Sequence, residues 1–344
     1  MGKVLHPGVY VEETRSRSII GTPTGVAGFV RENVAGPAQV SSYASLEAFE
    51  RDHPRWDAAR SFFEEGGKRL LIAPAVISDG ASVAAALTRL VEADIVAAPG
   101  MSEPAVAHAL IAHAETHRSL ALIDPPPGLD GANVRAFRAQ FDSGYAALYW
   151  PWIVDHAGRQ PPSPAIAGIF ARSDAEHGIG RSSSAVVRTA VCFERMVNNT
   201  EQEVLNPLGI NCLRSFPGRG NLVWGVRTMS NFGELKYVPV RRHLNWLQNS
   251  IEAGLAWTAF EANDERLWAT IRSAIAAFLQ AHWRTGGLQG VDARQAYFVR
   301  CDATTMTPTD ILEGRLVVVM GVALQRPAEF IHIRIVKQTA GRSA

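Results

Sequence analysis

The chain has 344 residues, of which 47% are hydrophobic and 19% charged, enough for about two globular domains with buried cores. The formal net charge of +1 gives no argument for a nucleic-acid partner, and the apolar runs are too short to cross a bilayer. Three cysteines form no CxxC pair, and the N-terminal stretch lacks a signal-peptide core. We therefore expect a protein that folds in a cytoplasm, without direct membrane insertion.

A short strand-like stretch stands alone near the start of the chain. Residues 7–13 read PGVYVEE, and Val9, Tyr10 and Val11 predict extended backbone. The polar stretch TRSRS at residues 14–18 follows, so no adjacent strand can pair with them. A lone strand leaves backbone N–H and C=O groups without partners. The sheet that completes it is expected far along this chain or on another molecule.

Apolar strands and helices then alternate as far as residue 154. Strands are predicted at 25–30, 69–77, 94–100, 119–128 and 145–154, and helices at 55–67, 83–93, 103–117 and 131–141. Ser82 is the expected cap of the second of these helices. The alternation predicts an outer α/β domain with a mostly parallel sheet and helices on its faces.

The pattern changes after about residue 206, where strands come first. Strands are predicted at 210–216, 222–229 and 237–242, two long helices at 244–260 and 264–283, and closing strands at 296–301, 315–324 and 329–337. Asn263 is the expected cap of the second helix, whose apolar stripe includes Leu267 and Ile271. This layout predicts a C-terminal α+β core domain.

We place a domain boundary near residue 196. The expected division is an N-terminal arm and strand at 1–20, the outer domain at 21–195, and the core domain with a terminal strand at 196–344. In that last strand Phe330 precedes the alternating residues Ile331, Ile333 and Ile335, which point to one side. Both ends of the chain are therefore strand-like pieces, and both are followed or preceded by polar residues.

Catalytic chemistry is weakly represented. His113 and His117 lie four residues apart on one helix face but lack the glutamate of a zinc-protease motif, so solvated histidines are expected. Two glycine-rich stretches, FPGRGN and GGLQG, do not complete a phosphate loop. Arg241 and Arg242 are interpreted as a solvated basic spot, and Trp268, off the apolar stripe, as a side chain that could face a partner. We expect no catalytic residue, no cofactor and no metal.

Several long motifs resemble the tail-sheath family of contractile phages and phage-like injection machines. In the N-terminal half these are PGVYVEE, GTPTGVAGFV, FFEEGGKRLLI, YWPWI and IAGIFARSDAEHG. In the C-terminal half they are LNPLGINCLRSFPGRGNLVWGVRTMS, FEANDERLWATIR, YFVRCDATTMTPTDILEGRL and RPAEFIHIRI. The resemblance covers nearly the whole chain in order. The chain is short for the family and looks like its two-domain core, without inserted outer domains.

The resemblance implies a structural, non-enzymatic polymer. Subunits of the family stack as hexameric rings around an inner tube, exchange terminal strands with their neighbours, and contract to drive the tube through a target envelope. The implied partners are further copies of this chain, the inner tube protein, and baseplate and terminal cap proteins. The implied location is a bacterial cytoplasm during assembly, and then a virion tail or a released extracellular particle.

The resemblance also suggests roles for individual residues. The exchanged strands would contain Val9, Tyr10, Val11, Phe330, Ile331, Ile333 and Ile335. The hinge that absorbs movement would be Thr14, Arg15, Ser16, Arg17 and Ser18. Arg266, Arg272 and Gln280, beside the apolar stripe of the last long helix, are the candidates for contact with the inner tube.

Two alternatives stay open at the level of the sequence. One is an α/β enzyme with an unrecognised crevice site at the strand ends of residues 69–154. The other is a minor sheath-like tail component, which would share the fold but be present in few copies.

Overall fold

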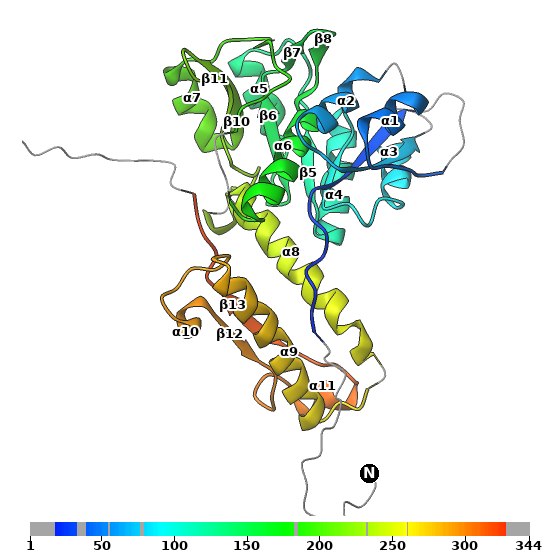
Figure 1. The fold of residues 1–344 in the computed structure, drawn as a ribbon, viewed down its shortest axis with the longest axis vertical. Coiled ribbons are helices and arrows are strands. Elements are labelled where there is room, and N and C mark those ends of the chain that lie inside the picture. The colour runs from blue at the N-terminus through cyan, green and yellow to red at the C-terminus, as the bar shows by residue number, and fades with distance from the viewer. Residues whose placement is uncertain are drawn as a thin grey trace, which may run out of the picture. The chain divides into compact units, whose positions relative to one another are not determined.

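The computed structural model describes residues 18–32, 39–53, 56–75, 79–181, 185–231, 233–259 and 261–327. Over these ranges the chain forms two compact units (Figure 1). The larger unit holds residues 23–246 and 324–327, and the smaller unit holds residues 18–22 and 247–323. The division falls within helix α8 (Val238–Leu255).

The larger unit is built on a sheet that has eight strands among the described residues, ordered β11-β10-β6-β5-β4-β1-β3-β2. The strands are β1 (Val26–Glu32), β2 (Ser41–Tyr43), β3 (Arg69–Ala75), β4 (Ile95–Ala97), β5 (Leu120–Ile123), β6 (Ala146–Trp150), β10 (Ile210–Phe216) and β11 (Gly220–Trp224). The six inner strands are parallel, and β2 and β11 are antiparallel edges. The predicted mostly parallel sheet is confirmed. A smaller sheet contains β7 (Ile153–Asp155), β8 (Gly158–Gln160) and β9 (Cys192–Phe193).

Helices cover both faces of the large sheet. They are α1 (Leu46–Asp52), α2 (Asp57–Glu64), α3 (Gly80–Leu87), α4 (Pro104–His117), α5 (Gly131–Arg138), α6 (Pro162–His177) and α7 (Asn199–Leu205), with the 3-10 turns η1 (Asn206–Leu208) and η2 (Gly233–Leu235). One apolar core joins the sheet to α3, α4, α5 and α7, and a second joins it to α1, α2, α6 and the start of α8. Strand β1 shows why: Val26 and Val30 enter the first core, while Ala27 and Phe29 enter the second. Burial on both faces explains the continuous apolar strands of the sequence.

Two helix caps differ from the sequence prediction by a few residues. Asp79, not Ser82, caps α3, and its carboxylate accepts a hydrogen bond of 2.7 Å from the Ser82 N–H. Asp264, not Asn263, caps α9 (Glu265–Arg284), and accepts a bond of 2.8 Å from the Leu267 N–H. In both cases the carboxylate sits three residues before the N–H that it satisfies, which is the favoured N-cap geometry.

The largest difference from the sequence prediction concerns residues 210–242. Strand β10 pairs with β6, from Ile210↔Leu148 to Cys212↔Trp150, so β10 and β11 extend the large sheet. The predicted strand at 237–242 was wrong, because these residues begin helix α8 apart from Tyr237, which precedes it. The larger unit therefore continues to Trp246, whereas the sequence placed a boundary near residue 196.

The smaller unit packs one long helix against a pair of short strands. Its elements are the C-terminal part of α8, the 3-10 turn η3 (Ala256–Thr258), α9, α10 (Ala293–Ala296), β12 (Tyr297–Arg300), α11 (Pro308–Leu312) and β13 (Val319–Val322). The predicted apolar stripe of α9 is buried, with Leu267, Ile271, Ile275 and Leu279 at most 8% exposed. In the described ranges, no helix combines the length and apolarity that a bilayer span requires.

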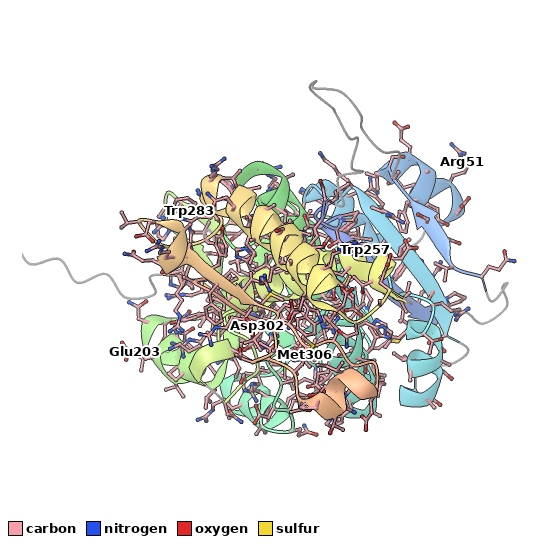
Figure 2. All side chains as sticks on the ribbon, turned by 90° about the horizontal axis from the view of Figure 1, so that it is seen from below. Arg51, Glu203, Trp257, Trp283, Asp302 and Met306 are labelled. Carbon is pink, nitrogen blue, oxygen red and sulfur yellow. The ribbon has the colours of Figure 1, made fainter. Side chains whose placement is uncertain are left out.

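Three tryptophans of the smaller unit, Trp257, Trp268 and Trp283, are buried or half-buried. Trp268 is 7% exposed and donates its Nε1–H to Asn263 Oδ1 at 2.7 Å, so the expectation that it faces a partner was wrong. Trp283, labelled in Figure 2, is half-buried and donates to the Gly290 carbonyl at 3.1 Å. Trp257, also labelled in Figure 2, is half-buried in η3. The indoles of Trp268 and Trp283 are therefore held by hydrogen bonds within their own unit.

Candidate functional site

A small antiparallel sheet in the smaller unit consists, among the described residues, of β12 and β13. Four pairs hold it, from Tyr297↔Val322 to Arg300↔Val319. The Ala323 N–H donates to the Ala296 carbonyl at 2.8 Å and continues the ladder. An isolated two-stranded sheet is marginally stable in water, so this one needs support from a helix or from further strands.

The outer edge of β13 is open in the part of the chain that the structure describes. Because Ala323 bonds to Ala296, the alternation of an antiparallel ladder turns the N–H and C=O groups of Met320 and Val322 away from β12. No third strand among the described residues pairs with them. An edge of this kind is a template for a strand from another segment or another molecule.

Helix α9 supports one face of this sheet. The Tyr297 hydroxyl donates to Gln280 Oε1 at 2.7 Å, and Arg272 Nη1 donates to the Cys301 carbonyl at 2.5 Å. On the other face Phe298 is 47% exposed, with the Arg300 guanidinium 5.3 Å from its ring centre. Two of the three predicted tube-contact residues, Arg272 and Gln280, are thus bonded within their own unit.

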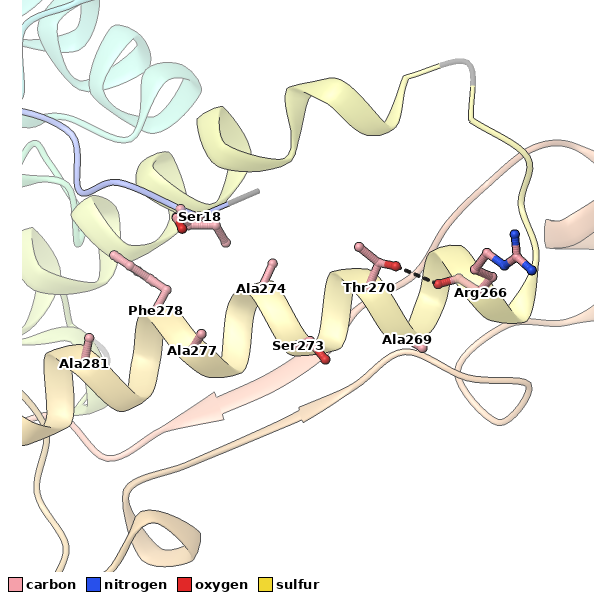
Figure 3. Close-up of a pocket in the computed structure, with 10 residues that line it drawn as sticks. Ser18, Arg266, Ala269, Thr270, Ser273, Ala274, Ala277, Phe278 and Ala281 are labelled. Carbon is pink, nitrogen blue, oxygen red and sulfur yellow. Dashed lines mark hydrogen bonds between the residues drawn. The ribbon is translucent and has the colours of Figure 1, made fainter. Parts of the chain in front are cut away.

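Arg266, the third predicted tube-contact residue, is exposed and lines a groove along α9 (Figure 3). The groove has a volume of about 730 Å³. Its lining is mostly small side chains, with Ser18 and Ile19 of the N-terminal segment beside them; the α9 residues are Arg266, Ala269, Thr270, Ser273, Ala274, Ala277, Phe278 and Ala281. Arg266 therefore lies at the groove, whereas Arg272 and Gln280 form hydrogen bonds with Cys301 and Tyr297.

The predicted exchange strands lie outside the described residues. This applies to Val9, Tyr10, Val11, Phe330, Ile331, Ile333 and Ile335, and also to Thr14, Arg15, Ser16 and Arg17 of the expected hinge. Ser18 is the first described residue of the chain, and it is exposed. The assignments for these residues stay predictions, whereas the sheet edge they would meet is described.

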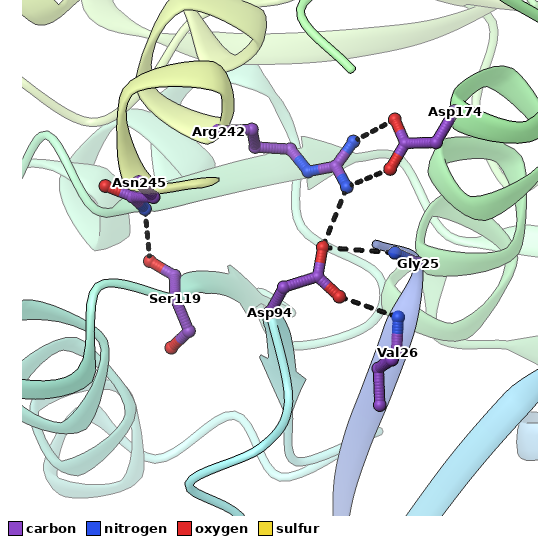
Figure 4. A network of polar contacts seen from close by, with 7 residues as sticks. All are labelled: Gly25, Val26, Asp94, Ser119, Asp174, Arg242 and Asn245. Atoms are coloured by element: carbon purple, nitrogen blue, oxygen red, sulfur yellow. Dashed lines mark hydrogen bonds and ion pairs between the residues drawn. The ribbon is translucent and has the colours of Figure 1, made fainter. Parts of the chain in front are cut away.

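A buried charge cluster in the larger unit was missed by the sequence analysis (Figure 4). Arg242 of α8 donates to both carboxylate oxygens of Asp174, at 2.9 and 2.6 Å, and to Asp94 at 3.0 Å. Asp94 also accepts the backbone N–H groups of Gly25 and Val26, at 3.2 and 2.6 Å. The cluster ties α8, α6, the residue before β4 and the start of β1 to one another.

The interpretation of Arg241 and Arg242 as a solvated basic spot was wrong, because their exposed fractions are 3% and 6%. Burial alone would lower the pKa of Arg242, but the carboxylates of Asp174 and Asp94 raise it above its ordinary value. Arg241 instead places its guanidinium 4.0 Å from the ring centre of Tyr145. Nothing in the local sequence predicts these partners, which are remote in the chain.

At the carboxyl ends of the parallel strands, where an α/β enzyme would bind its ligand, Asp124 follows β5 and is buried. Its carboxylate accepts the Ser163 hydroxyl at 2.6 Å and the backbone N–H groups of Ser163 and Gly100, at 2.9 and 3.2 Å. Burial raises its pKa to about 6, against the lowering by these hydrogen bonds. Both oxygens are engaged by the protein, so Asp124 connects β5 to the start of α6 and does not present a free catalytic acid.

The histidines of α4 are not both solvated as predicted. His113 is 8% exposed, and its ring centre lies 4.5 Å from that of His117. Burial, with a smaller contribution from His117, lowers the pKa of His113 to about 4. No group of three or more potential metal ligands is present among the residues that the structure describes.

Comparison with known families identifies two consecutive domains. Residues 78–229 match the phage tail sheath protein central domain, and residues 233–338 match the phage tail sheath C-terminal domain. A protein of Pseudomonas aeruginosa (strain UCBPP-PA14) described as a prophage major tail sheath protein is 27% identical over 54% of this chain and 51% of its own length. The tail sheath protein of Vibrio phage KVP40 is 27% identical over 62% of this chain and 32% of its own. The chain spans about half or less of these relatives.

Solved structures match over nearly the whole chain. A chain of the anti-feeding prophage (AFP) baseplate has a TM-score of 0.83 at 29% identity, covering 98% of this chain and 100% of that one. The sheath complex of the extracellular contractile injection system PVC, in its contracted state, has a TM-score of 0.83 at 26% identity, covering 98% and 99%. The contracted AFP helical sheath has a TM-score of 0.80 at 29% identity, covering 97% and 100%. These relatives are structural proteins and not enzymes, and this chain belongs to the phage tail sheath family.

Proposed function

We propose that this chain is the subunit of a contractile sheath. Copies polymerise as stacked hexameric rings around an inner tube, and contraction drives the tube through a target envelope. The match to the contracted AFP and PVC sheaths over nearly their full lengths supports this function. The match to a baseplate chain solved with 6-fold symmetry supports ring-like assembly next to a baseplate.

One observation carries the proposal: the open edge of β13 beside Met320 and Val322. Strands from sister molecules would complete this sheet by β-augmentation. The residues proposed for those strands are Val9, Tyr10, Val11, Phe330, Ile331, Ile333 and Ile335. A contact that uses different surfaces on the two partners and does not close on itself produces a helical polymer.

The magnitudes suit a joint that survives contraction. Each backbone hydrogen bond contributes roughly 0.5–1.5 kcal/mol net, so a shared strand with about five bonds contributes several kcal/mol. Burial of an apolar side chain adds roughly 1.5–3 kcal/mol. Exposed ion pairs contribute about 0–1 kcal/mol each and can be exchanged during movement. The strand joints would therefore persist while polar faces of the domains change partners, with the hinge in residues 14–18.

The proposed partners are the inner tube protein, baseplate proteins and a terminal cap protein. Arg266, exposed on α9, is a candidate for contact with the tube. Arg272 and Gln280 are weaker candidates, because their hydrogen bonds with Cys301 and Tyr297 lie within their own unit. Assembly would take place in a bacterial cytoplasm, before the particle becomes a virion tail or is released.

The edge of β13 is tested by Met320→Pro. Proline removes the N–H that faces an added strand, and edge positions tolerate proline better than central ones. We expect the free subunit to keep its far-ultraviolet circular dichroism, while electron microscopy finds no sheath-length polymers. Met320→Ala, which keeps the N–H, is the matched control and should form polymers. Normal sheaths from the proline variant would contradict the use of this edge.

Deletion of residues 1–18 tests the exchanged N-terminal strand. The truncated subunit should stay folded, because the buried side chains that the structure describes begin at Ile19 and are all retained. Sheath-length polymers should be absent, as measured by electron microscopy and by sedimentation of the assembled fraction. Sheaths of ordinary length from the truncated protein would exclude exchange of residues 9–11.

A minor sheath-like component is the second candidate, and the baseplate match favours it as much as the sheath matches favour the polymer. Such a component would share the fold but form a single ring. Quantitative mass spectrometry of purified particles gives the number of copies of this chain in each particle, which separates the two candidates. Many copies, enough for a stack of rings, support the sheath. Only the few copies of a single ring support the minor component.

A further inference from the structure

The segment that leads to the N-terminal arm is held against α8. Ile19 is 7% exposed, and its side chain occupies the space where Gly254 lacks one. A Cβ at Gly254 would lie 2.7 to 3.0 Å from Cγ1, Cγ2 and Cβ of Ile19. Nonbonded carbon atoms do not approach one another this closely, so the Ile19 side chain can pack here only because residue 254 is glycine.

A second contact lies one helical turn earlier on α8. Ser250 is fully buried, and its hydroxyl accepts the Thr22 N–H at 2.9 Å and lies 3.2 Å from the Thr22 hydroxyl. Positions four residues apart share a helix face, so Ser250 and Gly254 form one seat for the segment 18–22. Ile20, between the two contacts, is 80% exposed and takes no part in it.

The chain that continues from this seat is also fixed. Within the larger unit, Asp94 accepts the N–H groups of Gly25 and Val26, and Arg242 holds Asp94. Gly25 has φ +71°, and a Cβ there would lie 2.8 Å from Ala171. The backbone from Ile19 to Val26 is therefore constrained at both of its ends by contacts within the respective units.

We propose that Ser250 and Gly254 are positioning residues for strand exchange, because they fix the point from which the N-terminal arm leaves the subunit. The inference rests on the proposed sheath function. With Ser18 as the point of departure, the seven residues back to Val11 reach at most about 25 Å. If the seat were released as far as Val26, fifteen residues would reach about 50 Å. The seat thus limits how far away an acceptor sheet can lie and confines the hinge to residues before Ile19.

The first experiment tests the seat in the unassembled full-length subunit. Hydrogen exchange of the peptide covering residues 18–24 is followed by mass spectrometry. We expect protection in the wild type and exchange at least about fivefold faster in Ser250→Ala, which removes one hydrogen-bond acceptor. Gly254→Ala should lose protection further. Ala253→Ser, an exposed neighbour on α8, is the control and should behave as the wild type. An unprotected peptide in the wild type would overturn the seat.

The second experiment tests the positioning role. Alanine is a better helix former than glycine by about 1 kcal/mol, so Gly254→Ala should not lower the melting temperature of the subunit through α8 itself. We expect it to shorten or disorder the sheaths seen by electron microscopy. Adding Ile19→Ala makes room for the new methyl group and should restore sheath length at least in part.

The outcomes separate this inference from the proposed function. If Gly254→Ala loses protection yet builds sheaths of wild-type length and regularity, the positioning role is wrong while the sheath function stands. If the wild type builds no polymer with its tube and baseplate proteins, the sheath function fails, and the exchange experiment still decides whether the seat exists.

Discussion

Arg242 shows how a single residue connects distant parts of the larger unit. Its guanidinium serves two carboxylates, and its side chain and that of Asp174 are 5% and 4% exposed. Charges taken out of water require paired and hydrogen-bonded partners. Its two partners are 68 and 148 residues away in the chain. The local sequence shows only two adjacent arginines, which is why it predicted a solvated basic spot.

Replacing Arg242 should be far more costly than replacing a surface arginine. Arg242→Met keeps much of the volume but leaves Asp174 buried without its cation, and we expect a loss of about 3–5 kcal/mol in the free energy of unfolding. Arg60→Met is the control, because the Arg60 side chain is 48% exposed in its pairs with Glu50 and Glu64, and should cost at most about 1 kcal/mol. Urea unfolding measures both. Equal losses would show that the buried cluster is not stabilising.

Asp124 gives the larger unit a pH dependence of predictable sign. Its pKa rises from 3.8 in the unfolded chain to about 6 in the folded protein, so the folded state binds the proton more tightly. The stability that this group contributes is present below about pH 4 and is lost as the pH rises to about 6. The shift corresponds to a difference of about 3 kcal/mol between the two ends of this window.

Asp124→Asn should remove this dependence. We expect the free energy of unfolding of the variant, relative to the wild type, to increase steadily between pH 4 and pH 6 and to stay level above it. His113, whose pKa is lowered to about 4, acts in the opposite direction, so the difference between the two proteins is the quantity to measure. Urea unfolding across this range gives it. A constant difference would mean that Asp124 does not titrate in this window.

At the scale of packed elements, one glycine, Gly168 of α6, allows helices α2 and α6 to approach closely. A Cβ at Gly168 would lie 2.3 Å from the Phe62 carbonyl oxygen and 2.8 Å from Cβ of Glu65. Glu65, fully buried, accepts bonds from Arg172 at 2.8 Å and from the Thr189 N–H at 2.8 Å. The close approach therefore also positions the acid that joins α6 to the segment before β9.

Gly168→Ala should destabilise the larger unit although alanine is the better helix former. The overlap is with backbone, which cannot rotate away, and overpacking typically costs about 1–3 kcal/mol. Gly233→Ala is the control, because nothing lies within 4 Å of a Cβ built there. Urea unfolding of both variants checks the prediction. A stabilised Gly168 variant would show that the two helices can move apart at little cost.

The sequence predicted elements well where the apolar pattern is strong. It failed where pairing with a distant strand determines the domain to which a strand belongs. Strands β1, β3, β4, β5 and β6 were expected near their observed positions, since each is an apolar run with clear stops. Strands β10 and β11 were predicted as strands but assigned to another domain, because pairing with β6 is a long-range event. Residues 238–242 read as a strand because of alternating valines, yet they begin α8.

At the scale of the whole molecule, the larger unit contains its own cores. Every residue of its two apolar clusters lies between Val26 and Val238. A compact unit with complete cores can fold alone. The division of the chain at Trp246, and not near residue 196, therefore has a direct consequence for which fragment is stable.

A fragment of residues 23–246 should fold on its own. We expect it to be soluble and to unfold cooperatively in urea. A fragment of residues 23–195 lacks β10 and β11, which leaves the edge of β6 at Leu148 and Trp150 uncovered, and it should aggregate. Size-exclusion chromatography and circular dichroism of the two fragments measure this. A stable, monomeric shorter fragment would favour the earlier boundary.

The sequence by itself determined that this chain alternates strands and helices around a parallel sheet and that it resembles tail sheath proteins; that its ends are strand-like pieces stays a prediction. These features depend on neighbouring residues or on long motifs, both of which are readable along the chain. Only the tertiary structure decided that β10 and β11 join the large sheet, that Arg242 is buried between Asp94 and Asp174, and that Ile19 seats on Gly254. Each of those depends on groups brought together from distant positions, and their distances are set by packing, for which local pattern carries no signal.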